Sequence, residues 1–128
     1  MPTSRPAWTE NQTLQAAQTV NASSSDTDDL DLDAAGFDEV LLIFAVTFNG
    51  SATGDYLIEI FTSADGGSND STVPIISQPV ECDPGQTVRV SVSVAGVPYI
   101  AVKRTNEDGS YSITNETVMY AGRKWSHT

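Results

Sequence analysis

The sequence is poor in cysteine and in long apolar runs. Cys82 is the only cysteine among 128 residues, which excludes an intrachain disulfide and the metal sites that need paired cysteines. The longest apolar run, Val40 to Val46, is too short to span a bilayer, and residues 1–10 lack the apolar stretch of a signal peptide. We therefore expect a soluble protein without an export signal, whose free thiol suits a reducing cytosol.

Basic residues are scarce and unevenly placed. Six Lys and Arg residues stand against 17 Asp and Glu residues, which gives a formal net charge of −11. Arg5 is the only basic residue before Arg89. Phosphate binding needs clustered cations, so nucleic acid is not expected as a partner. The charge pattern predicts either a surface that promotes solubility or an acidic body with a basic C-terminal edge that docks onto a charged partner.

Residue types that carry catalysis are also scarce. His127, the only histidine, lies one residue from the end of the sequence, which is a poor position for a general base. Cys82 stands between Glu81 and Asp83, whose charges raise a thiol pKa and suppress the reactive thiolate. We expect no enzymatic activity and no cofactor. The remaining enzymatic alternative is a pair of carboxylates, as in glycoside hydrolysis.

The sequence is rich in short alternating segments separated by turn residues. Ser, Thr, Asn and Gly dominate its uncharged polar part, a mixture typical of strands and turns. It predicts an all-β fold, an antiparallel jelly-roll-like β-sandwich of about eight strands without a convincing helix. An extended N-terminal arm, the sandwich and a C-terminal tail are expected at residues 1–12, 13–121 and 122–128. The strands are expected at residues 13–20, 26–33, 39–48, 55–62, 73–77, 88–94, 97–105 and 111–120.

The strongest strand signal lies at residues 39–48. This segment is apolar on both alternating faces, which predicts a central strand covered on both sides. A glycine-bounded loop follows it, so the segment is predicted to form a β-hairpin with residues 55–62. Residues 13–20 and the proline-containing residues 73–77 are predicted as edge strands. Four valines alternate with polar residues in 88–94, which is typical of a strand with one buried face.

Two acidic segments resemble cation sites. The loop at residues 63–71 offers Asp65, Asn69 and Asp70, oxygen ligands of the kind that calcium prefers, but the spacing does not match an EF-hand. The same residue types form ordinary turns, which is the interpretation that we adopt. Strand 26–33 alternates leucines with aspartates, and we expect the aspartates to form a solvated outer face. No metal site is therefore predicted.

Two tryptophans lie in the terminal segments, outside the predicted strands. A large aromatic side chain at such a place either packs back onto its own domain or anchors an interface with a partner. Basic residues lie close to both tryptophans in the sequence. The predicted interface residues are Arg5, Trp8, Arg123, Lys124 and Trp125.

The order of segments between Leu30 and Tyr120 carries a resemblance to a known group of proteins. It comprises Asp38-Glu39-Val40-Leu41-Leu42-Ile43, a strand that ends in Ser63-Ala64-Asp65-Gly66, and a later strand with Tyr99-Ile100-Ala101-Val102. This order resembles the small β-sandwich accessory proteins in the virions of tailed bacteriophages. That group includes capsid decoration (cement) proteins and tail or fibre-base adaptors.

The resemblance implies a structural protein of the virion that is assembled in the host cytoplasm. Such a protein binds and stabilises an assembled capsid lattice, often as a trimer, so the implied partners are the major capsid protein or tail proteins and further copies of the chain. No membrane partner is expected. A tail or fibre adaptor and a glycan-binding β-sandwich module are the alternatives, and the carboxylate hydrolase is a third.

Overall fold

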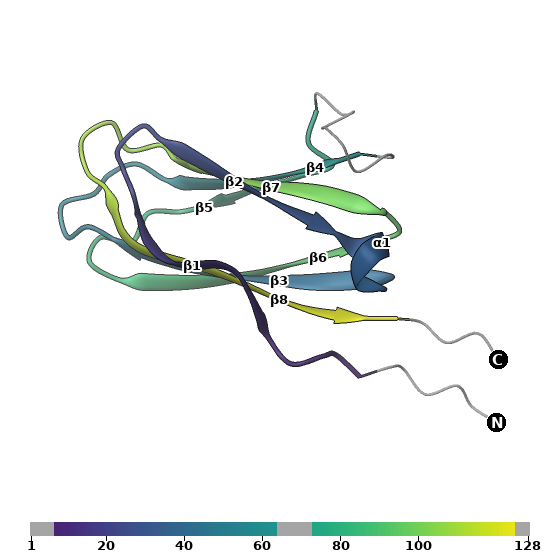
Figure 1. Cartoon of the computed structure of the whole chain (residues 1–128). Helices are drawn as coiled ribbons and strands as arrows, with labels where there is room; N and C mark the ends of the chain where they lie inside the picture. The colour runs from purple at the N-terminus through teal and green to yellow at the C-terminus, as the bar shows by residue number, and fades with distance from the viewer. Residues whose placement is uncertain (1–6, 64–72, 125–128) are drawn as a thin grey trace.

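The computed structural model describes residues 7–63 and 73–124 of the chain. Within these residues, two four-stranded antiparallel sheets stack face to face (Figure 1), which confirms the predicted β-sandwich of about eight strands. The elements are β1 (Gln12–Val20), β2 (Ser25–Asp31), α1 (Leu32–Ala35), β3 (Glu39–Phe48), β4 (Tyr56–Thr62), β5 (Ile76–Val80), β6 (Thr87–Ala95), β7 (Tyr99–Asn106) and β8 (Ile113–Arg123).

The strand order contradicts one sequence prediction, the β-hairpin between residues 39–48 and 55–62. The first sheet has the order β1-β8-β3-β6 and the second has the order β2-β7-β4-β5. Because β3 and β4 lie in different sheets, the predicted hairpin between them is wrong. A tight two-residue turn would force two consecutive strands to pair with each other. The seven-residue connection at 49–55 is instead long enough to cross the roughly 10 Å between stacked sheets.

The strand predicted at residues 26–33 ends early, and a single helical turn follows it. The Asp31 side chain accepts a hydrogen bond from Ala34 N at 2.9 Å and so caps the turn, and Gly36 ends it with a φ of 77°. The expectation of a fold without helix therefore misses α1. The alternation holds nonetheless, because Leu30 and Leu32 are both buried.

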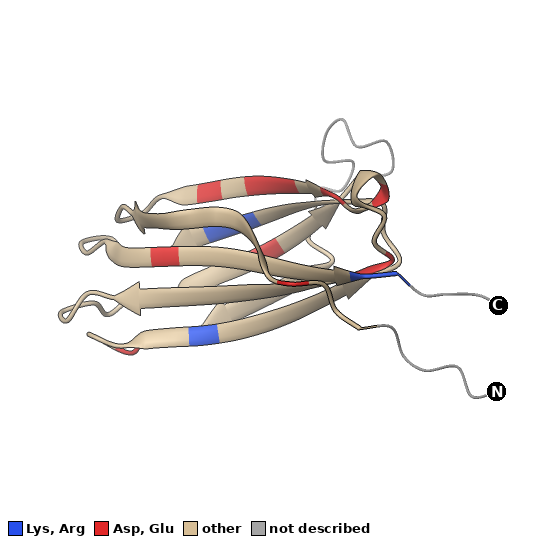
Figure 2. Cartoon of the chain, turned by 60° about the horizontal axis from the view of Figure 1, so that its bottom comes forward, with Lys and Arg blue, Asp and Glu red and all other residues tan. Residues whose placement is uncertain are grey.

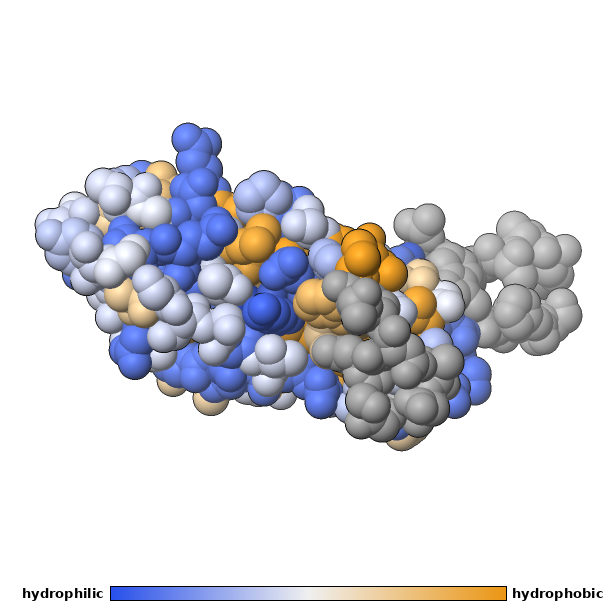
Figure 3. All heavy atoms as spheres, turned by 90° about the horizontal axis from the view of Figure 1, so that it is seen from above, coloured by the Kyte–Doolittle hydropathy of each residue, from blue (hydrophilic) through white to orange (hydrophobic). Residues whose placement is uncertain are grey.

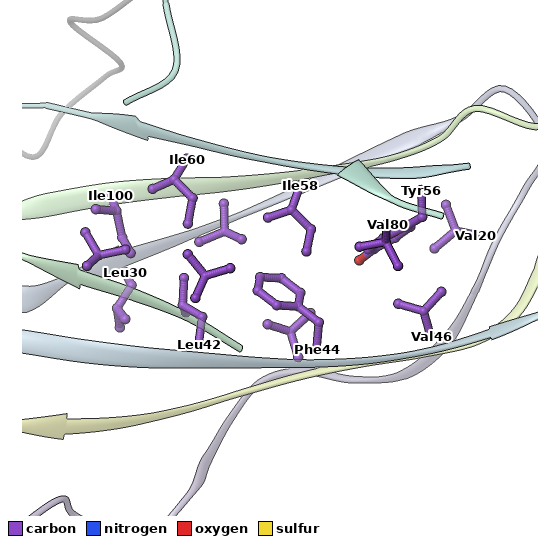
Figure 4. Close-up of a cluster of buried hydrophobic side chains, with 14 of the residues drawn as sticks. Val20, Leu30, Leu42, Phe44, Val46, Tyr56, Ile58, Ile60, Val80 and Ile100 are labelled. Atoms are coloured by element: carbon purple, nitrogen blue, oxygen red, sulfur yellow. The ribbon is translucent and has the colours of Figure 1, made fainter. Parts of the chain in front are cut away.

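The hydrophobic core fills the space between the two sheets (Figure 4). One face of β3 supplies Leu42 and Phe44, which are fully buried, and Ile58 of β4 approaches them from the other sheet. β3 is central in its sheet, as predicted. Its opposite face is not fully covered, since Leu41 and Ile43 are only half-buried. A two-layer sandwich gives each strand one face in the core, so the expectation of two covered faces is wrong.

A buried ionic cluster joins the two sheets. Arg104 of β7 alternates with apolar residues that face the core, and its side chain is fully buried. Its Nη2 lies 3.0 Å from Oε1 of Glu116 on β8, which is also fully buried, and its Nη1 lies 2.8 Å from Oδ2 of Asp28 on β2. The Tyr56 hydroxyl of β4 donates to Glu116 Oε2 at 2.5 Å. Four strands from both sheets therefore share one cluster of charges.

The same cluster closes the side of the sandwich where β1 meets β2. Gln18 Nε2 donates to Asp26 Oδ2 at 2.7 Å and to Glu116 Oε1 at 2.9 Å. Burial and the charge of Glu116 raise the pKa of Tyr56 far above its ordinary value, so this phenol keeps its proton. Burial alone would lower the pKa of Arg104, but the hydrogen bond and charge of Glu116 outweigh it and raise that pKa.

The loops at one end of the sandwich are held by Asp108. Its carboxylate accepts backbone hydrogen bonds from Thr53, Gly54, Ser110 and Tyr111 at 2.8 to 2.9 Å. These bonds hold the pKa of the Asp108 carboxyl well below its ordinary value. Gly54 is required in this place, because a Cβ there would lie 2.4 Å from the Cα of Asp108. The four donors fix this end of the molecule without a disulfide.

Replacement of Arg104 by Met is expected to lower the free energy of unfolding by about 3–5 kcal/mol, because Glu116 would stay buried without its cation. The measurement is equilibrium unfolding in urea. Lys103→Met is the matched control, since Lys103 points to the outer face of the same strand and should change stability by less than about 0.5 kcal/mol. Equal losses in the two variants would contradict a special role of the buried ion pair.

Candidate functional site

The first candidate site is a terminal cluster formed by Trp8, Glu39 and Arg123. The two ends of the described chain lie side by side at the end of the sandwich that carries α1 (Figure 1). The guanidinium carbon of Arg123 lies 4.0 Å from the centroid of the Trp8 ring. Its Nη2 lies 2.7 Å from Glu39 Oε1. A cation above an indole face and beside a carboxylate is held from two sides.

The backbone around the cluster explains its position. Thr9 N donates to Gly122 O at 2.9 Å, and Gly122 N donates to Thr9 Oγ1 at 3.0 Å, so the arm lies along β8 before β1 begins. The Phe37 ring occupies the space that a Cβ at Gly122 would need, at a distance of 2.3 Å. Glycine at this position therefore lets the segment after α1 pack against the end of β8.

The structure brings together two of the five predicted interface residues. Trp8 is half-buried and Arg123 is 7% exposed, and they contact each other within one chain. Lys124 is exposed next to them. Arg5 and Trp125 lie outside the described residues. The predicted interface with a partner therefore stays a prediction.

The other sites considered from the sequence give no ligand site in the described part of the chain. The acidic loop at 63–71, which was interpreted as a turn, lies outside the described residues except for Ser63. His127 lies outside them as well. Within 7–63 and 73–124, no group of three or more His, Cys, Asp or Glu side chains is arranged to hold a metal ion. None of the helices described there is long and apolar enough to cross a membrane. Asp29 and Asp31 are exposed on β2, as expected.

The outer face of the second sheet does not form a continuous apolar surface. Seen from above, orange and blue residues are interspersed along the molecule (Figure 3). Leu57 and Phe61 of β4 are half-buried there, and Glu59 lies between them. Glu59 is paired in register with Lys103 of β7. A broad docking face of apolar side chains is therefore not found on this side.

The four edge strands of the two sheets differ in how they resist the addition of a further strand. β1 pairs with β8 through three register shifts, which distort its backbone ladder. β2 contains four aspartates among seven residues. β5 has five residues, one of which is Pro79. Irregularity, charge, shortness and proline are the usual means by which proteins protect sheet edges.

The β6 edge lacks all of these protections except for one charge. Its nine residues pair with β3 without a register shift and include no proline, glycine or acid. Arg89 is its only charged residue, and β6 accordingly carries one basic band and no acidic one (Figure 2). Sequence reasoning identified a strand with one buried face here but not that it lies at an edge. No local signal gives that position, because it depends on the strand order.

The hydrogen-bond pattern shows which backbone groups of β6 point outward. Phe48 N donates to Gln86 O, and Gly96 N donates to Asp38 O, so the even-numbered residues between 86 and 96 are the ones bonded to β3. The odd-numbered residues direct their N–H and C=O groups away from β3. No other described strand neighbours β6 on that side. The residues whose backbone N–H and C=O groups point away from β3 are Thr87, Arg89, Ser91, Ser93 and Ala95.

A shallow groove runs beside this edge, between β6 and the end of β5. Val88 and Val90 form one wall and are only half-buried, whereas Val92 and Val94 further along β6 are buried. Cys82 also lines the groove, and its thiol pKa is raised by burial and by the charges of the surrounding carboxylates. The direction agrees with the sequence prediction. The remaining lining residues are Pro79, Val80, Glu81 and Asp83.

Comparison with known proteins shows the fold. No protein-family model and no curated protein matches the chain. A solved structure of Bacillus endospore appendages, which form disulfide-linked pili, is similar with a TM-score of 0.52 and 11% identity, over 98% of this chain and 96% of that one. The K1 cleaved adhesin domain of Lys-gingipain from Porphyromonas gingivalis W83 has a TM-score of 0.51 and 10% identity, over 91% and 98%. At such identities the likeness concerns the β-sandwich alone.

Replacement of Trp8 by Ala is expected to lower the free energy of unfolding by about 1 kcal/mol, because Arg123 would lose the indole face that it contacts. Urea unfolding measures the loss. Glu10→Ala serves as the control, since Glu10 is exposed two residues further along the arm. If Trp8→Ala is as stable as the control, the aromatic contact does not hold the arm.

The Cys82 thiol is expected to react with iodoacetamide at a higher pH than an ordinary cysteine. A raised pKa leaves less thiolate at a given pH, and the thiolate is the reacting form. The rate is measured as a function of pH for the folded protein and for the same protein in urea. The midpoint of the folded form should lie above that of the unfolded form, and a midpoint below it would contradict the arrangement of acids around the groove.

Proposed function

We propose that this protein is a non-enzymatic structural subunit that joins a larger repetitive assembly through the β6 edge. The observation that carries the proposal is the regular, weakly protected strand β6, whose outward backbone groups lie beside the groove lined by Val88 and Val90. Such an edge can pair with an extended strand from another chain. Hydrogen bonds between the two backbones give affinity, and the adjacent groove binds every second side chain of the added strand. Natural sheets that remain monomeric block edges of this kind.

The buried ionic cluster supports a structural role. Its Tyr56 and Arg104 side chains both have raised pKa values, and groups with shifted pKa values are frequent in active sites. The side chains of Arg104 and Glu116 are fully buried and bonded to each other, so a substrate has no access to them. Their arrangement serves the packing of the two sheets.

The assembly that we favour is the virion of a tailed bacteriophage, with a capsid decoration role and a tail or fibre adaptor as the next choice. The segment order described above supports this choice, as does an acidic body suited to a solvent-facing position on a particle. The second candidate is a pilus subunit or an adhesive, glycan-binding module. The similar sandwiches in a pilus and in an adhesin domain favour it.

Immunogold electron microscopy tests the proposal. Antibodies raised against the purified chain are applied to lysates and whole cells of the organism that encodes it. Regularly spaced gold on phage heads or tails is the expected result. Gold on filaments or on the cell surface would support the second candidate and overturn the virion role. Label that stays diffuse in the soluble fraction would overturn the structural function altogether.

The role of the edge is tested in the same assay with Ser91→Pro. The backbone N–H of Ser91 points away from β3, so proline removes a donor for an added strand without breaking a bond to β3. Ser91→Thr is the control, because threonine keeps the donor and favours strands. We expect labelling to fall several-fold for Ser91→Pro and to persist for Ser91→Thr. A thermal melt shows whether each variant is folded.

A further inference from the structure

We infer that the strand which adds to β6 is β6 of a second copy, paired antiparallel about a two-fold axis through Ser91. The inference rests on the proposed assembly role and names the partner at the same edge. Antiparallel pairing of a strand with itself makes the two partners identical, as a two-fold symmetric interface requires. It would join two four-stranded sheets into one continuous sheet of eight strands.

The outer face of β6 is complementary to itself in this register. A two-fold axis at Ser91 places Arg89 opposite Ser93, and Thr87 opposite Ala95. No acid occurs on the strand, and Arg89 meets a small neutral residue, so no like charges face each other directly. All odd-numbered residues would exchange N–H and C=O bonds with the partner, because their backbone groups are the ones that point outward.

The inner face of the strand matches in the same way. The axis places Val88 opposite Val94, and Val90 opposite Val92. Pairs of β-branched residues are favourable across neighbouring strands. Val88 and Val90, the two valines left half-buried beside the groove, would gain cover from the partner's buried pair. Pairing would therefore reduce the difference in burial between the two ends of β6 that exists in the single chain.

The other described edges fit β6 less well. β1 is irregular, β2 is acidic, and β5 is short and contains a proline. Each of these features protects a strand from pairing. Among the described edges, β6 of a second copy is therefore the best partner for β6. Two bodies with a net charge of −11 also repel each other. Added salt screens that repulsion and should strengthen the pair, whereas an interface held by surface ion pairs would weaken.

A cross-linking experiment tests the register. In a Cys82→Ser background, Ser91→Cys would place two identical Cα atoms about 5.5 Å apart across the axis, within the range of a disulfide. Ser93→Cys is the matched control, because its two copies would lie four residues apart, about 14 Å along the strands. After mild oxidation with diamide, a non-reducing gel should show several-fold more covalent dimer for Ser91→Cys than for Ser93→Cys.

Light scattering on the cysteine-free Cys82→Ser protein gives the second measurement. We expect a dimer that forms at high protein concentration, increases with salt and is lost in Ser91→Pro but kept in Ser91→Thr. A monomer under all conditions, or equal cross-linking of the two cysteine variants, overturns the inference. Particle labelling lost in Ser91→Pro would still support the proposed function in that case, whereas a dimer that labels no assembly would overturn the function and leave the pairing intact.

Discussion

Arg104 and Glu116 face each other between the two sheets, and the arrangement of the sandwich depends on keeping them together. Either charge alone would be costly in this position, because both side chains are fully buried. A one-residue slip of β7 would turn Arg104 to the outer face and Lys103 to the core. The ion pair thus favours one register in β7 and β8 together, and the apolar alternation of the remaining strands agrees with it.

The same constraint makes the two long sides of the sandwich unequal. On the β1 and β2 side, Gln18 and Asp26 continue the ionic cluster to the surface and tie the two edges together. On the β5 and β6 side, no comparable polar contact between the edges occurs among the described residues, and a groove with valine walls remains. Acids that protect β2 are part of the cluster, whereas β6 contributes no residue to it and is separated from β8 by β3.

Alternation in the sequence was sufficient to predict the fold class and the burial of Leu30 and Leu32. The central position of β3 was predicted from its two apolar faces, although only one of them lies in the core. Arg104 could also have been found, since it stands on the face of β7 that carries Ile100 and Val102. Glu116 is harder to recognise, because the register shift near the start of β8 breaks the alternation between Ile113 and the rest of the strand. Local patterns do not encode strand order, which is why the hairpin was wrong and the β6 edge was missed.

The inferred β6 pairing would place the terminal clusters of the two copies in a relation fixed by symmetry. Both described ends of the chain lie at the α1 end of the sandwich, and the terminal cluster holds them there through Trp8 and Arg123. Two copies paired through antiparallel β6 strands run in opposite directions, so their terminal clusters would lie at opposite ends of the pair. If the proposed assembly binds the chain at this cluster, such a pair would have one attachment end for each of two neighbouring subunits. Bridging would then require no large interface on either sheet face, which agrees with the mixed polar surface over Leu57, Glu59 and Phe61.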